Sequence, residues 1–313
     1  MKNNVKKIIL FLRNIIFSVL FLGRICFIRM FSSNKKIIFT ECYFSFSCFK
    51  IKNNNWGDDI NKYLFEYVTK RNVINYPFSK TILLNRVNPF SLIGSILTFY
   101  DLQGKIVYGS GVMNPNIRLR NKPNKIISVR GPKTRQVFIK NGIECPEHYG
   151  DPALLLPVFY TPKSNRSSRG GLILNMGTSN NEFDSAIRVA KELNLVIINM
   201  RNYNNWTDVI EQIYSCDYII SESLHGLIVA ETYGVPNVWV EFKKHPEYWG
   251  FKYIDYYESI GKEERIMHIT SETSMNEILE QINKWKKGDI DYKLLLSYFP
   301  FEINCPINES LLK

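Results

Sequence analysis

One short segment combines a proton-carrying side chain with a turn that would expose it. Residues 221–226 (Ser-Glu-Ser-Leu-His-Gly) lie between an apolar run at 218–220 and a helical pattern that begins at 227. His225 is therefore expected close to a helix N-terminus, where backbone N–H groups favour an anion and the positive helix end lowers a histidine pKa. A histidine near neutrality can shuttle protons. We predict that His225 is catalytic and that Ser221 and Glu222 bind substrate beside it; capping or packing at a tight turn is the structural alternative.

A second junction of the same kind carries two cations. Residues 128–134 (Ser-Val-Arg-Gly-Pro-Lys-Thr) follow another apolar run, and Pro132 suits the first position of a helix. Arg130 and Lys133 would then lie near a helix N-terminus. An arginine can hold a carboxylate through two parallel hydrogen bonds, so the pair suits a ligand with a carboxylate and a phosphate. We predict that both bind substrate, with a solvated surface position as the alternative for Lys133.

Three further segments give weaker signals for substrate binding. The first precedes a helix and contains a glycine that permits close approach of a ligand, although its aspartate could serve only as a helix cap. The second is a pair of glycines after a strand pattern, and the third is a pair of lysines beyond the strand pattern at 238–240. These candidates are Asn55, Gly57 and Asp58, then Gly109 and Gly111, then Lys243 and Lys244.

The bulk composition restricts the classes of partner. A net charge of +11 favours ligands that carry phosphate, but the chain has no nucleic-acid motif, so nucleic-acid binding is not expected. Its six cysteines form no C-x-x-C pair, which is typical of a reducing compartment. The sequence has no H-E-x-x-H motif, no Walker A loop and no paired Cys/His set. We therefore expect no metal and no tightly bound cofactor.

The elements that must position these residues alternate between strands and helices. The first set has strand patterns at 37–39, 106–108 and 126–129, with helical patterns at 58–70 and 132–141. The second has strand patterns at 172–176, 195–199, 218–221 and 238–242, with helical patterns at 184–193, 207–216, 224–233 and 275–286. Such alternation is typical of parallel sheets, in which ligands bind beyond the carboxyl ends of the strands.

Between the two sets, residues 161–171 are polar and rich in Ser and Gly, as a linker would be. We therefore predict an α/β protein with two Rossmann-like domains that face a cleft, 35–163 and 164–313.

Residues 1–34 form a third, different segment. The first 36 residues hold eight Lys or Arg and no acidic residue, and the longest charge-free stretch, 15–23, is well short of the ~20 residues that span a bilayer. No small-residue cleavage site follows, as a signal peptide would require. We predict a membrane-associated helix, peripheral on the cytoplasmic face of the cell membrane. A buried core helix and an uncleaved signal anchor are the alternatives.

Five segments, in type and order, resemble the polysaccharide pyruvyl transferase family. They are 55–58 (Asn-Trp-Gly-Asp), 109–111 (Gly-Ser-Gly), 130–134 (Arg-Gly-Pro-Lys-Thr), 150–153 (Gly-Asp-Pro-Ala) and 221–226, within a likeness that covers roughly residues 50–245. The resemblance implies a fold similar to the GT-B glycosyltransferases, phosphoenolpyruvate as donor and co-substrate, and a sugar acceptor that can be lipid-linked.

Roles follow from the matching positions. His225 corresponds to the family's active-site histidine, which would act as general acid on the enol carbon. Arg130 would bind the donor, and Lys243 or Lys244 matches a donor-binding lysine. Some members carry an arginine two residues before the histidine, where this chain has Ser223. A donor-binding cation is therefore absent from this chain or is supplied from elsewhere.

The expected function is transfer of a pyruvyl group from phosphoenolpyruvate to a pair of sugar hydroxyls, with ketal formation, in bacterial surface polysaccharide synthesis. Two other functions remain open. The first is a GT-B glycosyltransferase that uses a nucleotide sugar, and the second is a non-catalytic scaffold of polysaccharide assembly. The acceptor sugar, the stereochemistry of the ketal and the oligomeric state do not follow from the sequence.

Overall fold

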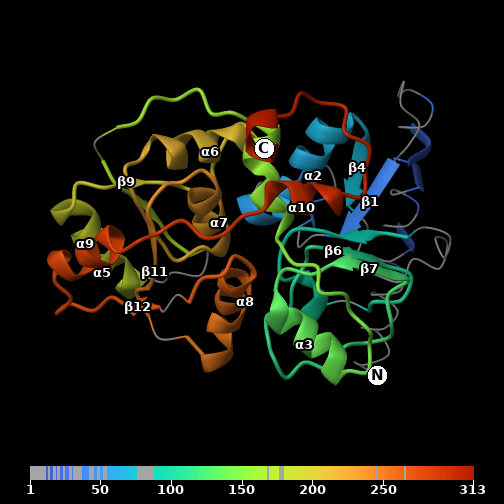
Figure 1. Ribbon diagram of the computed structural model, residues 1–313, viewed down its shortest axis with the longest axis horizontal. Helices are drawn as coiled ribbons and strands as arrows, with labels where there is room; N and C mark the ends of the chain where they lie inside the picture. The colour runs from blue at the N-terminus through green and yellow to red at the C-terminus, as the bar shows by residue number, and fades with distance from the viewer. Residues whose placement is uncertain are drawn as a thin grey trace.

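The computed structural model describes residues 37–41, 46–47, 50–51, 55–75, 88–99, 101–167, 169–175, 180–243, 245–263 and 266–313, together with isolated positions between 12 and 30. Two five-stranded sheets organise the chain, and the pairings within each are parallel (Figure 1). The protein is thus α/β with two parallel sheets, in agreement with two Rossmann-like halves.

The first sheet has the strand order β4-β1-β5-β6-β7. Its strands are β1 (Ile37–Glu41), β4 (Asn72–Asn75), β5 (Phe90–Ser91), β6 (Ile106–Tyr108) and β7 (Lys125–Ser128). Its long helices are α2 (Trp56–Thr69) and α3 (Pro132–Lys140). α2 starts after the N-cap Asn55 and ends at Lys70, whose left-handed backbone stops the helix. A short hairpin of β2 (Phe46–Ser47) and β3 (Lys50–Ile51) lies between β1 and α2 in the chain.

The second sheet has the order β12-β11-β10-β8-β9. Its strands are β8 (Gly171–Ile173), β9 (Val196–Ile197), β10 (Ile219–Ser221), β11 (Asn237–Glu241) and β12 (Met267–His268). The helices of this part are α5 (Asn180–Glu192), α6 (Trp206–Ser215), α7 (Leu224–Thr232), α8 (Phe251–Ser259) and α9 (Met275–Asn283). Every residue of β8, β10 and β11 is buried, as expected for strands covered on both faces.

The sequence patterns located these elements well. Every strand and helix predicted in the second half is present, with ends that differ by up to four residues, and the same holds for those of the first half. The patterns did not predict β4, β5, β12, α8 or the C-terminal helix α10 (Tyr292–Ser297). Between α4 (Leu156–Phe159) and β8, where the linker was predicted, the described residues form no helix or strand. The division into domains at residue 163 stays a prediction.

One hydrophobic core joins the two halves. Its largest cluster combines Trp56 and Phe65 from α2 with Leu224 and Ile228 from α7, all of them buried. The chain end strengthens this contact, because after α9 it crosses back to the first half (Figure 1). There the ring of Phe299 stacks on that of Phe65 with centroids 5.9 Å apart. Because the same core holds both halves, their relative position is set by packing.

The expected membrane-associated helix at 1–34 lies mostly outside the described residues. Among those that the structure does describe, none belongs to a helix both long and apolar enough to cross a bilayer.

Candidate functional site

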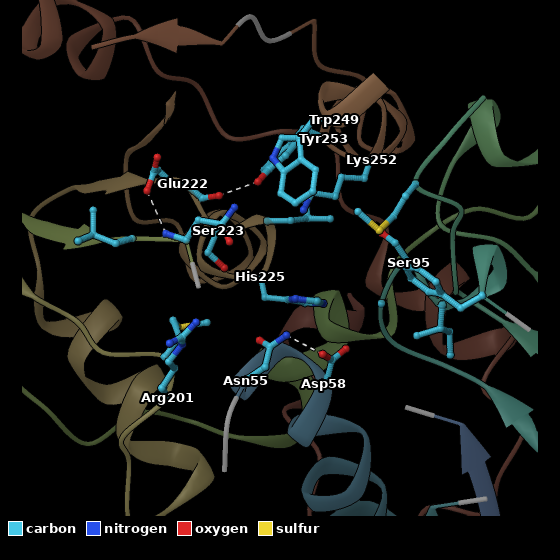
Figure 2. A pocket seen from close by; sticks show the side chains of 18 residues that line it. Asn55, Asp58, Ser95, Arg201, Glu222, Ser223, His225, Trp249, Lys252 and Tyr253 are labelled. Atoms are coloured by element: carbon cyan, nitrogen blue, oxygen red, sulfur yellow. Dashed lines mark hydrogen bonds between the residues drawn. The ribbon is translucent and has the colours of Figure 1, made fainter. Parts of the chain in front are cut away.

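A cavity of about 590 Å³ lies between the two halves (Figure 2). Its wall includes the residues that follow β5, β8, β9 and β10, so it occupies the carboxyl ends of strands from both sheets, where open α/β sheets bind ligands. The polar side chains that line it are Asn55, Asp58, Ser95, Asn175, Arg201, Glu222, Ser223, His225, Trp249, Lys252 and Tyr253. The volume is typical of a small-molecule site.

His225 lies in the first turn of α7, directly after β10. Ser223 caps this helix through its hydroxyl, which accepts from the backbone N–H of Gly226 at 3.4 Å. The predicted junction of strand and helix is therefore confirmed. The Nε2 atom of His225 is shut off from solvent and has no hydrogen-bond partner among the described residues. Buried polar atoms rarely lack a partner, so this nitrogen is a candidate contact for a ligand.

The imidazole ring of His225 packs directly against the backbone of Gly57. A Cβ built on Gly57 would lie 2.0 Å from His225 Nδ1, a distance that no real side chain tolerates. Gly57 is in the first turn of α2, in the other half of the molecule from His225. The group that the structure places against Gly57 is the histidine ring, while the close approach of a ligand at Gly57 stays a prediction.

The N-terminus of α2 is fixed to the second half by hydrogen bonds. The backbone N–H of Trp56 donates to the carbonyl of Met200 at 2.9 Å, and its indole Nε1 donates to the carbonyl of Trp206 at 2.7 Å. Tyr203 donates its hydroxyl to Asp59. These bonds hold Gly57 and its neighbours in register with His225.

Asn55 and Asp58 form a cap at the start of α2. The Oδ1 atom of Asn55 accepts from the N–H of Gly57 at 3.3 Å, and its Nδ2 donates to Asp58 Oδ2 at 2.6 Å. Both side chains also line the cavity, below His225 in Figure 2. Capping and ligand binding therefore coexist at this position.

Several titratable groups on the cavity wall have displaced pKa values. Burial, together with the positive charges of Lys252 and Arg130, lowers the pKa of His225 to about 3. Burial raises the pKa of Asp58 to about 7, against the stabilising hydrogen bond from Asn55. Burial lowers the pKa of Lys252 to about 8. Groups displaced in this way are concentrated at functional sites.

Lys252 is a cation on which two opposite charges, Asp58 and Glu241, act without a direct ion pair in the part of the chain that the structure describes. Its ammonium lies over the rings of Trp249 and Tyr253, at 4.2 and 4.9 Å from their centroids. Among the described residues it makes no hydrogen bond and no ion pair. A charge removed from water is normally paired, so this part of the wall is suited to an anionic ligand.

Arg130 lies behind the cavity wall and does not line it. Its side chain is fully buried and pairs with Asp255 at 2.9 Å, while a second nitrogen donates to the hydroxyl of Ser95 at 2.5 Å. A Cβ on Gly111 would lie 2.3 Å from the guanidinium carbon, so Gly111 makes room for this arginine. The guanidinium is already compensated, and it acts on the cavity by holding Ser95.

Ser221 and Glu222 brace the turn that carries His225. The Ser221 hydroxyl accepts from the N–H of Ser223 at 2.9 Å and donates to its carbonyl at 3.0 Å. Glu222 accepts from the backbone N–H groups of Asn175 and Phe242, each at 3.0 Å, and so ties β8 and β11 to β10. Glu222 also lines the cavity, whereas the buried Ser221 does not.

The remaining predicted residues lie elsewhere. Lys133 pairs with Glu258 at 3.0 Å, with both side chains about one third exposed, and it does not line the cavity. Gly109 has φ +76° and packs against Pro152, so it serves the local turn. Lys243 is outside the cavity lining, and Lys244 lies outside the described residues.

Sequence reasoning missed Lys252, Ser95 and Arg201. Lys252 was missed with its helix α8, because a run rich in aromatic residues gave no clear pattern. The spacing of Tyr253, Tyr256 and Tyr257, which are all buried, is nevertheless that of one helix face. For Ser95 and Arg201, in irregular segments after strands, no sequence signal was available.

The described part of the chain contains no group of three or more His, Cys, Asp or Glu side chains placed to hold a metal ion.

Comparison with known proteins identifies the family of the chain. The family model for polysaccharide pyruvyl transferase matches residues 87–243, half of the 313-residue chain. The chain belongs to the polysaccharide pyruvyl transferase family. It is also similar to the uncharacterized protein L143 of Acanthamoeba polyphaga mimivirus, at 27% identity over 226 residues, which cover 68% of this chain and 73% of the viral protein. The matched span includes His225 and Arg130, whereas Asp58 and Lys252 lie outside it.

Proposed function

We propose that this member of a transferase family moves a pyruvyl group from phosphoenolpyruvate to a pair of sugar hydroxyls and forms a ketal, in the synthesis of a surface polysaccharide. The observation that carries the proposal is that one cavity between the halves holds a cation, Lys252, that makes no direct ion pair among the described residues, and a histidine nitrogen that has no hydrogen-bond partner among them. Phosphoenolpyruvate carries a phosphate and a carboxylate that can bind Lys252. It also carries an enol whose methylene carbon can take a proton from His225.

His225 donates the proton that starts the reaction. With a pKa of about 3 it is neutral in the empty cavity at pH 7, since burial and Lys252 disfavour its charge. A donor phosphate that binds Lys252 supplies negative charge, so the histidine takes up a proton when the donor binds. It then transfers that proton to the methylene carbon, and the adjacent carbon becomes an oxocarbenium-like centre.

Attack by two hydroxyls completes the ketal. The first hydroxyl oxygen bonds to the electrophilic carbon, the bond from that carbon to the phosphate oxygen breaks, and its electron pair leaves with phosphate. The second hydroxyl then bonds to the same carbon. Of the two hydroxyl protons released, one replaces the proton that His225 gave to the methylene carbon and the other leaves on phosphate, so that atoms and charge balance.

Lys252 takes the place of the arginine that some family members carry two residues before the histidine. That position is Ser223 here, and its hydroxyl is used as the cap of α7. Lys252 approaches the same cavity from α8. In this proposal the donor-binding cation has thus moved to another element.

The test is phosphate release from phosphoenolpyruvate in the presence of a membrane extract as the source of acceptor. We expect phosphate release that depends on the extract and is abolished in His225→Ala. The KM for phosphoenolpyruvate should rise in Lys252→Met and stay unchanged in the exposed control Lys140→Met. Release without acceptor, or equal release from His225→Ala, would contradict the proposal. Preferential binding of a nucleoside diphosphate would instead support the glycosyltransferase.

Residues 1–34 are proposed to hold the enzyme peripherally at the cytoplasmic face of the membrane, where a lipid-linked acceptor would be met. Two groups of large apolar side chains support this, because they are 53–71% exposed and within each group the spacing is three or four residues: Leu12, Ile16 and Val19, then Phe27 and Met30. Co-sedimentation with vesicles that contain anionic lipid should be lost when residues 1–34 are removed, and unchanged sedimentation would refute the proposal.

A further inference from the structure

We propose that Asp58 is the general base that takes the proton of the attacking sugar hydroxyl, so that Asp58 and His225 work as a pair contributed by opposite halves. The inference rests on the proposed pyruvyl transfer and assigns a second catalytic residue to it. Asp58 belongs to segment 55–58, which resembles the family, and lies outside the span 87–243 that the family model matches.

The two carboxylate oxygens of Asp58 have different surroundings. Oδ2 accepts from Asn55 Nδ2 at 2.6 Å, which fixes the side chain. Oδ1 has no hydrogen-bond donor among the described residues and lies beside Gly94, where a Cβ built on the glycine would be 3.4 Å away. Both Asp58 and Gly94 line the cavity. One oxygen is therefore held by the protein and the other is free to accept from a ligand.

The charges around Asp58 suit a base that works near neutral pH. The side chain is 8% exposed, and burial together with the nearby Asp59 raises its pKa, while Asn55 and Lys252 lower it, to about 7. General bases are most effective when the pKa lies close to the working pH. An anionic donor on Lys252 would raise the Asp58 pKa further, so the carboxylate form that acts as base predominates above pH 7.

Asp58 and His225 are neighbours across the interface of the halves. Gly57, which precedes Asp58, touches the imidazole, and the two side chains line adjoining parts of one wall in Figure 2. A hydroxyl that attacks the central carbon of the donor must lose its proton close to where the methylene carbon gains one. The pair provides both groups within one site.

The proton transfers balance over one turnover. As the first hydroxyl attacks, its O–H bond breaks and the proton moves to Asp58 Oδ1 while the C–O bond forms. His225, which has given its proton to the methylene carbon, is reprotonated by the second hydroxyl. The proton on Asp58 then leaves with the phosphate, and both groups return to their starting states.

The alternative is a purely structural role, because Asp58 also accepts a hydrogen bond from the N-cap residue Asn55 at the start of α2. Another aspartate in the chain serves as a control for the effect of helix capping. Asp208 closes a capping box with Asn205 at the start of α6, where it accepts from the backbone of Asn205 at 2.8 Å, and it does not line the cavity. A capping effect should appear in both aspartates, whereas a catalytic effect should appear in Asp58 alone.

The experiment compares Asp58→Asn with Asp208→Asn, using phosphoenolpyruvate and the membrane extract. We expect Asp58→Asn to lower kcat by about 100-fold or more, the usual contribution of a general base, with a Kd for phosphoenolpyruvate within about threefold of wild type. The fall in wild-type kcat/KM below pH 7 should disappear in this variant. Asp208→Asn should keep both the kcat and the pH profile.

Retention of kcat in Asp58→Asn, or a loss matched by Asp208→Asn or by a lowered Tm, would overturn the assignment. So would a low-pH limb that survives in Asp58→Asn. These outcomes differ from failure of the proposed function, which would appear as a wild-type enzyme without acceptor-dependent phosphate release.

Discussion

At the scale of residues, the empty site has an inverted distribution of protons. With pKa values of about 7 for Asp58 and about 3 for His225, the carboxyl group holds a proton more tightly than the imidazole does. The proposed reaction needs the reverse. An anionic donor must therefore bring protonation of His225 with it, and binding and activation become one event.

This coupling predicts proton uptake. At pH 7, binding of phosphoenolpyruvate should take up protons, measured by titration calorimetry in two buffers with different enthalpies of ionisation. His225→Asn should lower the uptake, and what remains belongs to Asp58 and Lys252, whose pKa values of about 7 and about 8 also rise when an anion binds. Equal uptake in the variant would show that the imidazole stays neutral.

The raised pKa of Asp58 also has a consequence for stability. Its folded-state pKa of about 7 lies above its ordinary value of 3.8, so the folded protein binds the proton more tightly and loses stability as pH rises from about 4 to 7. One pKa unit is worth about 1.4 kcal/mol. The rise of about three pKa units corresponds to at most about 4 kcal/mol, so Asp58→Asn should be more stable than wild type by up to that amount at pH 8, with little difference at pH 4. Chemical denaturation at the two pH values would measure this, and a variant less stable at pH 8 would point to lost capping.

At the scale of elements, the contact between α2 and α7 is the tightest constraint on the site. Gly57 is helical, and alanine in a helix is favoured over glycine by about 1 kcal/mol. The 2.0 Å contact with His225 Nδ1 nevertheless leaves no space for a methyl group. Gly57→Ala should therefore lower kcat sharply and reduce Tm.

A double variant separates the clash from other effects. In Gly57→Ala/His225→Ala the imidazole is gone, so Tm should return to that of His225→Ala or above it. Gly23→Ala is the matched control, because no neighbouring atom of the part of the chain that the structure describes lies within 4 Å of the position its Cβ would take. Additive losses of Tm in the double variant would mean that Gly57 does not contact His225.

The elements were largely predictable, and the contacts between them were not. Apolar runs that end in polar residues gave the buried strands and the junction at His225, because both depend on neighbours in the chain. The partner of Arg130 is Asp255, 125 residues away, and nothing local distinguishes a buried ion pair from a ligand-binding arginine. Lys252 was missed because its helix α8 was not predicted, and the fold that brings α8 to the cavity could not be read from the local sequence either.

At the scale of the whole molecule, the C-terminal segment holds the halves together. Phe299 and Phe301 pack on Phe65 with centroids 5.9 and 5.6 Å apart, and the N–H of Asn304 donates to the carbonyl of Val68 at 2.7 Å. These contacts belong to residues that follow the second sheet in sequence, although they stabilise the first half.

The strength of this contact can be tested with a neighbouring pair of substitutions. Phe301→Ala should lower the free energy of unfolding by about 3 kcal/mol, because it removes a ring from an aromatic cluster. Glu302→Gln breaks only the ion pair with Arg71, in which the glutamate is 66% exposed, and should change it by less than about 1 kcal/mol. Urea denaturation distinguishes them, and equal effects would contradict the view that packing dominates.

The packing of His225 on Gly57 has a last consequence. The proposed acid, His225, is on one half, whereas Gly57 and the proposed base, Asp58, are on the other, so neither half alone contains a complete reaction centre. If the chain were cut in the irregular segment before β8 and the two fragments were produced separately, each should be inert. Activity should return only when the fragments reassociate, so the enzyme is a natural candidate for a fragment-complementation reporter.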